Sequence, residues 1–152
     1  MNPFENLKKL NIELPKAADP VGAYVAFKKI SNLLFISGQL PISSNGQMIK
    51  GKIGKDLTLE DGQKASQLCV INILAQVKKA LGGDLDKVKS CIKITGFVNS
   101  TDDFKDQPKV INPASETLST VFGVNGKHAR AAISTNSLPL GAAVEIDAIF
   151  EI

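Results

Sequence analysis

The chain has few of the residues that support metal, redox or disulfide chemistry. Its 152 residues include two cysteines, one histidine and no tryptophan. Cys69 and Cys91 show no spacing typical of metal ligands, and a single histidine does not complete a zinc site with them. Because the sequence shows no secretory signal, a disulfide is disfavoured. We therefore expect no metal site, and we expect both cysteines to be small core or interface residues.

The chain also lacks long apolar runs and blocks of one charge. No stretch of 18 uninterrupted apolar residues occurs, which argues against a membrane-spanning helix. The net charge is only +3, and the scattered lysines do not form the basic block typical of nucleic-acid tails. The first ten residues lack the charged region and apolar block of a secretory signal. We expect a cytoplasmic protein whose partner is neither a membrane nor a nucleic acid.

Apolar residues, in contrast, are numerous enough to build one core. They make up 43% of the chain, and charged residues make up 22%, as is typical of a globular protein. A length of 152 residues corresponds to one domain. We expect a single domain over residues 1–152, with a short N-terminal arm over residues 1–21.

The apolar patterning predicts two helices and five strands in the order β-β-α-β-α-β-β. The strands are expected near 24–30, 33–37, 88–99, 129–136 and 142–151. One helix is expected from the N-cap Thr58 to the stop signal Gly82-Gly83. A second is expected over 106–122 with a break or kink, because Asn112 before Pro113 makes a good cap. This order favours an α+β fold with both helices on one face of a mixed sheet. The strands are so apolar that partner subunits are the simplest cover for the other face.

The last two strands contain the most informative residues. Arg130 lies inside the first of them and Glu145 inside the second, each beside alanine, valine or isoleucine. Burying an unpaired charge is costly, so Arg130 must reach water, an acidic partner or an anionic ligand. An arginine fork matches a carboxylate with two parallel hydrogen bonds, so a small-carboxylate site is one interpretation. The other is an ion pair with Glu145, if the two strands pair through the 137–141 turn.

Three motifs are spread over nearly the whole chain. The first is Gly22-Ala23-Tyr24-Val25, and the second is Phe35-Ile36-Ser37-Gly38-Gln39-Leu40-Pro41. The third combines Arg130, Leu138-Pro139 and Val144-Glu145-Ile146, and it is the most specific. In this order and spacing they resemble the motifs of the reactive intermediate deaminase (RidA) family, also labelled YjgF or endoribonuclease L-PSP.

The resemblance implies a chorismate mutase-like α+β fold, in which a mixed six-stranded sheet carries two helices on one face. It also implies a homotrimer with its sites in the clefts between subunits. Active members hydrolyse reactive enamines and imines, such as 2-aminoacrylate, to 2-keto acids and ammonia, without a metal or cofactor. The expected partners are therefore a small 2-imino or 2-keto acid and further copies of this chain. Imines hydrolyse readily, so such a protein needs only to bind, orient and place one water.

The resemblance also implies roles for individual residues. Arg130 would hold the substrate carboxylate, helped by the backbone amide of Gly38. Glu145 would orient the attacking water. Tyr24 and Ser37 would line the pocket, facing the Arg130 of a neighbouring subunit.

The chain departs from the family pattern at two places in this expected site. Ala132 stands where many members have cysteine, so a reactive thiol is excluded there and only the backbone carbonyl is available. The segment over 101–112 is longer than in compact members. It leaves two candidates for the family's pocket asparagine, Asn112 and Ser115.

Other functions and simpler structural roles remain open on the sequence. A non-catalytic module that binds small carboxylates or keto acids would use the same Arg130, and only Glu145 separates it from an enzyme. An endoribonuclease ranks lower, because metal-free RNA cleavage usually relies on paired acid and base groups, often histidines. Tyr24 is alternatively an interface aromatic, Ser37 a cap for nearby backbone, and His128 a surface or interface residue.

Overall fold

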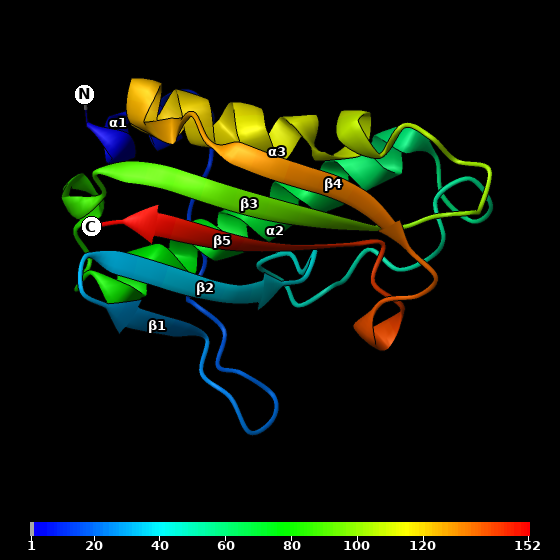
Figure 1. The fold of residues 1–152 in the computed structure, drawn as a ribbon, viewed down its shortest axis with the longest axis horizontal. Coiled ribbons are helices and arrows are strands. Elements are labelled where there is room, and N and C mark those ends of the chain that lie inside the picture. Colours follow the sequence, from blue (N-terminus) through cyan, green and yellow to red (C-terminus); the bar gives the residue numbers. More distant parts are fainter. Residues whose placement is uncertain (1) are drawn as a thin grey trace.

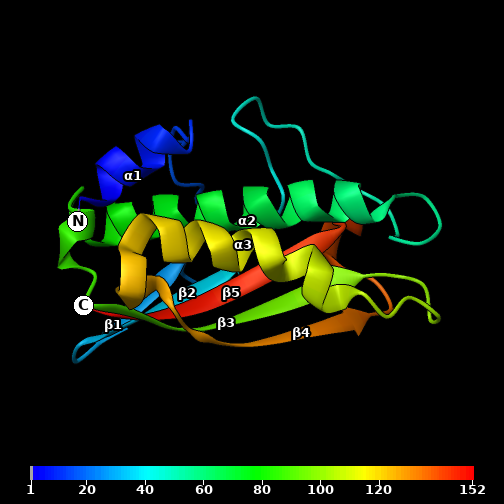
Figure 2. The same ribbon diagram turned by 90° about the horizontal axis from the view of Figure 1, so that it is seen from above.

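The structure, a computed structural model that describes residues 2–152, is a sheet covered by helices on one face. Its elements are α1 (Pro3–Lys9), β1 (Phe27–Ile30), β2 (Leu33–Gln39), α2 (Leu59–Ala80), β3 (Ser90–Asn99), α3 (Gln107–Phe122), β4 (Ala129–Thr135) and β5 (Val144–Glu151). Figure 1 looks onto the sheet, and Figure 2 shows α2 and α3 lying along one side of it. No helix within the described range is long and apolar enough to cross a membrane.

The sheet has the strand order β1-β2-β5-β3-β4. β3 and β4 are parallel and the other neighbours are antiparallel, so the predicted mixed sheet and α+β fold are confirmed. The expected count of six strands is wrong, because residues 2–152 form a sheet of five. The segment between β2 and α2 forms only isolated bridges. Gly46, Gly51 and Gly54 hold positive φ angles there, which interrupt an extended backbone.

The helix α2 begins and ends where the sequence predicts. Thr58 Oγ1 accepts a hydrogen bond from the Asp61 amide at 3.2 Å, and Asp61 Oδ2 accepts one from the Thr58 amide at 2.9 Å. This reciprocal pair is a capping box, and its bonds lower the pKa of the Asp61 carboxyl. The helix ends before Gly82 and Gly83, whose positive φ angles close it.

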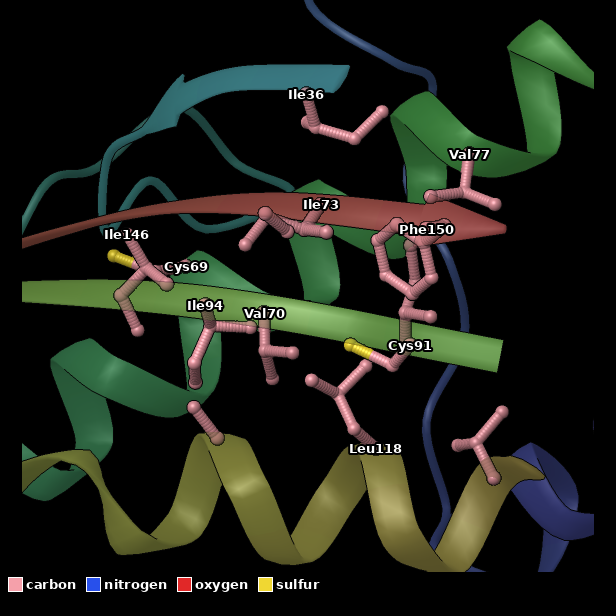
Figure 3. Packing of buried hydrophobic residues seen from close by; sticks show 14 of the residues in the cluster. Ile36, Cys69, Val70, Ile73, Val77, Cys91, Ile94, Leu118, Ile146 and Phe150 are labelled. Carbon is pink, nitrogen blue, oxygen red and sulfur yellow. The ribbon is translucent and has the colours of Figure 1, made fainter. Parts of the chain in front are cut away.

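The core lies between the helices and the sheet. Phe150 of β5 is fully buried and meets Phe122 in an edge-to-face arrangement, with ring centroids 6.2 Å apart. Figure 3 shows Cys69 and Cys91 among the apolar side chains of this core, and both are free thiols. Burial raises the pKa of Cys91 to about 12 and raises that of Cys69 well above its usual value. Neither thiol is ionised at neutral pH, so both are the interior residues that the sequence predicts.

Of the predicted break or kink at Pro113, the break is wrong, because α3 is continuous from Gln107 to Phe122. Pro113 has no N–H to donate to the Lys109 carbonyl one turn earlier. The Gln63 side chain of α2 donates to that carbonyl at 3.0 Å instead, so the proline leaves no unpaired acceptor behind it. Asn112 therefore caps no helix start, and its side-chain oxygen accepts a hydrogen bond from Arg130.

The beginning of the N-terminal arm is a third helix, α1, which packs against α3. Asn2 caps it by accepting a hydrogen bond from the Phe4 amide at 2.9 Å. Asn6 donates to the Val121 carbonyl of α3 at 3.1 Å, and Leu7 is buried in the core. The helix α1 therefore covers one end of the helix layer.

Candidate functional site

Arg130 lies on the edge strand β4, on the side of the sheet that the helices cover. The parallel register places it beside Ile94 of β3, which is fully buried in the core. Ala132 and Ser134 share this side, as strand alternation predicts. Because β4 is the last strand of the sheet, the long Arg130 side chain can reach α3 and the solvent at the sheet edge.

Three neutral acceptors of α3 hold the Arg130 guanidinium. Its Nη2 donates to Asn112 Oδ1 at 2.8 Å and to the Pro108 carbonyl at 3.2 Å. Its Nη1 donates to Ser115 Oγ at 3.2 Å. No carboxylate of residues 2–152 forms an ion pair with it. No carboxylate of these residues therefore offsets its positive charge, and two of its five N–H groups have no partner among the described residues.

His128 extends this arrangement beyond Ser115. Its Nε2 lies 2.9 Å from Ser115 Oγ, and its Nδ1 lies 2.7 Å from the Gly126 carbonyl oxygen. We call Pro108, Asn112, Ser115, His128 and Arg130 the Arg130 cluster. Both candidates for the pocket asparagine, Asn112 and Ser115, thus contact the same guanidinium.

Glu145 lies on the opposite, open face of the sheet. Its neighbours Val144 and Ile146 on β5 are fully buried, whereas Glu145 and Asp147 are partly exposed. The antiparallel register places Glu145 beside Phe97 of β3. We call Gly38, Phe97, Glu145 and Asp147 the Glu145 cluster.

A β-bulge brings Gly38 of β2 against Glu145. The register of β2 on β5 shifts between Ile36 and Gln39, so Ser37 and Gly38 have no regular partner there. A Cβ built on Gly38 would overlap the Glu145 carboxyl group and would lie 2.9 Å from its Cδ. A side chain at position 38 would therefore displace the Glu145 carboxylate, and glycine does not.

Desolvation by partial burial, together with the nearby Asp147 carboxylate, raises the pKa of Glu145 above its ordinary value of 4.5. Both causes disfavour the charged form. No residue among 2–152 forms an ion pair with this carboxyl group. A carboxylate with a raised pKa is a stronger base than an ordinary one.

The sequence-based pairing of Arg130 with Glu145 is wrong. β4 and β5 are not neighbours, because β3 lies between them. The two side chains also point to opposite faces, Arg130 with Ile94 toward the helices and Glu145 with Phe97 toward the open face. An ion pair within one chain is therefore excluded, and one chain does not bring both groups to a single pocket.

Two further residues of the predicted site, Ser37 and Tyr24, belong to the bulge and to the segment bonded to it. Ser37 donates its hydroxyl to the Val25 carbonyl at 2.6 Å, which is the structural role considered for it. This bond ties the Ser37-Gly38 bulge to the segment that carries Tyr24. Tyr24 is 54% exposed and is available to a second molecule. Gly38 thus lies with Glu145, and Asn112 and Ser115 lie with Arg130.

Sequence reasoning missed some members of these groups. The Pro108 carbonyl is a backbone group, which no residue pattern reveals. Phe97 joins Glu145 only through the register of β3 on β5. His128 was considered only as a surface or interface residue, although its position two residues before Arg130 is a signal that both could lie on one side of a strand.

Three cavities of the described residues lie away from the predicted site residues. One of about 290 Å³ lies at the ends of β3 and β4, and its lining includes Ser100, Thr101, Ser134 and Thr135. Two others, of about 400 and 350 Å³, lie along α2. Within residues 2–152 no group of three or more His, Cys, Asp or Glu could hold a metal ion.

Comparison with known proteins shows the class to which this fold and these motifs belong. Residues 5–151 match a family model described as "YjgF/chorismate_mutase-like, putative endoribonuclease". The chain belongs to this YjgF/RidA family, which confirms the resemblance seen in its motifs.

Relatives match over nearly the full length of the chain. Protein TCP17 of Trypanosoma cruzi is 43% identical over 97% of this chain and 92% of its own length. A 2-iminobutanoate/2-iminopropanoate deaminase of Mus musculus is 29% identical over 91% of this chain and 87% of its own. The crystal structure of protein Atu1372 from Agrobacterium tumefaciens is 49% identical, covers 99% of this chain and 92% of that one, and superposes with a TM-score of 0.92.

Proposed function

We propose that this protein hydrolyses small 2-imino acids, formed from enamines such as 2-aminoacrylate, to 2-keto acids and ammonia. The observation that carries the proposal is the Arg130 guanidinium, which α3 orients through three neutral groups, with no carboxylate bonded to it. Such a cation binds a small carboxylate. The mouse deaminase among the relatives supports the choice of substrate.

Imine hydrolysis requires one general base close to the attacking water. Water adds to the imine carbon of the substrate, and the resulting carbinolamine expels ammonia as its C–O bond becomes the carbonyl of the keto acid. Ionised Glu145 would take a proton from the attacking water and give it to the imine nitrogen, which forms the carbinolamine. It would then move the carbinolamine hydroxyl proton to the amine, so that both protons of the water leave with ammonia. Its raised pKa suits this exchange, because a catalytic pKa nearer the working pH transfers protons in both directions.

Two copies of the chain would complete one site. The sheet separates Arg130 from Glu145 within a single copy, so both can touch one substrate only if each comes from a different protomer. We infer a homotrimer in which the Arg130 cluster of one protomer faces the Glu145 cluster of the next. Ile30, Phe35 and Ile133 support this arrangement, because they lie 62%, 40% and 48% exposed on the open face and exposed apolar faces favour association.

A coupled assay tests the activity. Purified protein is added to a pyridoxal-phosphate dehydratase that releases 2-aminoacrylate from serine, and pyruvate formation is followed with dehydratase held constant. We expect pyruvate to form faster in proportion to added protein. An unchanged rate over a wide range of protein concentration would contradict the proposal.

Binding measurements separate this enzyme from the two other candidate functions. Wild-type protein that binds 2-ketobutyrate in a calorimetric titration and never accelerates imine hydrolysis would be a keto-acid binding module. An endoribonuclease would cleave RNA with an activity that stays with the protein through purification and disappears in Arg130→Ala. We expect turnover as well as binding. We expect no ribonuclease activity, since the one histidine of the chain is engaged with Ser115 and Gly126.

Gly38→Ala tests the contact between the bulge and the carboxylate. The added Cβ would push the Glu145 carboxyl aside, and a 1 Å misplacement of a catalytic group can cost about 10²-fold in rate. We expect kcat to fall about tenfold or more. The thermal midpoint should change little, because the end of a flexible side chain moves.

The same substitution made together with Glu145→Gln is the matched control. If Gly38 acts by placing the carboxylate, alanine should cost much less in a chain that has already lost it. A loss of equal size in both backgrounds would assign Gly38 another role, such as its backbone amide.

A further inference from the structure

We propose that His128 is a positioning residue, which fixes the orientation of Arg130 toward the substrate carboxylate through the Ser115 hydroxyl. The inference rests on the proposed function for its kinetic effect. Its structural basis is the chain of contacts from Gly126 through His128 and Ser115 to Arg130.

The contacts determine which imidazole nitrogen carries the hydrogen in neutral His128. Nδ1 lies 2.7 Å from the Gly126 carbonyl oxygen, which can only accept. Nδ1 must therefore carry the hydrogen and donate it. Nε2 is then an acceptor, and the Ser115 hydroxyl 2.9 Å away must donate to it.

This direction leaves the Ser115 oxygen suited to receive Arg130. A hydroxyl has one hydrogen and two lone pairs. With its hydrogen committed to His128, Ser115 turns its lone pairs toward Nη1 of Arg130, 3.2 Å away. Without the imidazole, the hydroxyl could rotate and direct its hydrogen elsewhere, including toward the cation.

Ser115 is the contact that fixes the second nitrogen of the guanidinium. Asn112 and Pro108 both hold Nη2, whereas only Ser115 among the described residues holds Nη1. Two anchored nitrogens fix the plane of the group, and one anchored nitrogen leaves it free to swing. Because Arg130 has many rotamers, fixing that plane before the substrate arrives saves ordering entropy on binding.

Two substitutions at His128 separate this role from simple packing. In His128→Gln the side-chain carbonyl can take the place of Nε2 and still accept from Ser115. In His128→Asn the amide can take the place of Nδ1 and keep the bond to Gly126, but the side chain is too short to reach Ser115. We expect KM for the imine to rise about fivefold in His128→Asn and less than about twofold in His128→Gln, with kcat little changed in both.

A double-mutant cycle with Ser115→Ala tests whether the two residues act as one unit. We expect the doubly substituted Ser115→Ala, His128→Asn protein to have the KM of Ser115→Ala alone, because His128 then has nothing to orient. Effects that multiply, or a His128→Asn variant with wild-type KM and affinity for 2-ketobutyrate, would overturn the proposal.

The tautomer gives a readout that does not depend on catalysis. His128 is the only histidine of the chain, so a long-range ¹H–¹⁵N spectrum contains one imidazole. We expect the neutral ring to carry its hydrogen on Nδ1 in the wild type. A hydrogen on Nε2 would overturn the positioning role of His128 and leave the proposed function standing. A wild-type protein that neither turns over imines nor binds 2-ketobutyrate would overturn the proposed function, and the positioning role with it.

Discussion

Replacing Arg130 with alanine will lower kcat/KM for the imine about 10²- to 10³-fold, mostly through KM. The lost interaction is a charge-assisted bond to the substrate carboxylate, and removing one partner of such a pair typically costs about 3–4 kcal/mol. The carboxylate is held alike in the ground and transition states, so kcat should change less. Steady-state pyruvate release in the coupled assay measures both constants.

Arg130→Lys is the matched control for charge. Lysine keeps the positive charge but cannot offer the planar set of donors that meets both α3 and a carboxylate. We expect an intermediate loss, about tenfold. Equal activity in the wild type, Arg130→Lys and Arg130→Ala would contradict a carboxylate site at this position. Loss of 2-ketobutyrate binding in Arg130→Ala with the thermal midpoint largely retained would distinguish a lost ligand contact from unfolding.

Replacing Glu145 with glutamine will lower kcat about 10²- to 10⁴-fold, which is the usual contribution of general acid–base catalysis. The amide keeps the shape of the side chain but cannot take a proton from water. KM and the affinity for 2-ketobutyrate should stay near the wild-type values, because Arg130 still holds the carboxylate. Unchanged turnover in Glu145→Gln would exclude Glu145 as the base.

The raised pKa of Glu145 gives this prediction a pH dependence. Catalysis needs the ionised carboxylate, and kcat/KM reports the ionisation of the free enzyme. Wild-type kcat/KM should therefore fall as the pH drops through a value above the ordinary 4.5. The effect of pH on the free energy of unfolding should have the opposite direction, so that the ionised carboxylate makes the fold less stable. The folded state binds the proton more tightly than the unfolded chain, so this carboxyl reduces stability as the pH rises through its folded pKa.

Glu145→Gln should therefore unfold at a higher temperature than the wild type at neutral pH. The difference should vanish in acid below the ordinary pKa, where the carboxyl is protonated in both states. Thermal denaturation at several pH values measures it. A variant that is less stable than the wild type at neutral pH would show that the carboxylate has a favourable partner in the assembled protein.

The two inactive variants together test whether sites form between protomers. Arg130→Ala lacks one half of the proposed site and Glu145→Gln lacks the other, so trimers that contain both variants would regain some intact sites. Random mixing in a ring gives about one intact site in four. We expect co-expressed variants to recover activity on that order, whereas no recovery would contradict a site shared between neighbours.

The sequence indicated the elements of the fold because their signals are local. Such local signals are the Thr58 cap, the Gly82-Gly83 stop and the alternation of β5. Each depends on residues that are close together in the sequence. The break predicted at Pro113 failed, because a distant residue, Gln63, satisfies the carbonyl that the proline leaves unpaired. Long-range partners of this kind leave no trace in a local pattern.

The candidate site shows the same division. The motifs of the chain were sufficient to select Arg130, Glu145 and Gly38 and to identify the family. They did not show that β3 separates the two charged residues, that α3 rather than Glu145 holds the guanidinium, or that His128 belongs to the same cluster.

The sequence by itself determined the strand alternation and the helix caps, because each follows from the chemistry of neighbouring side chains. The neighbours of each strand, and therefore the face on which each charge lies, were decided only in three dimensions. Strand order depends on how the helices cover the sheet, and that packing joins residues that lie far apart in the sequence.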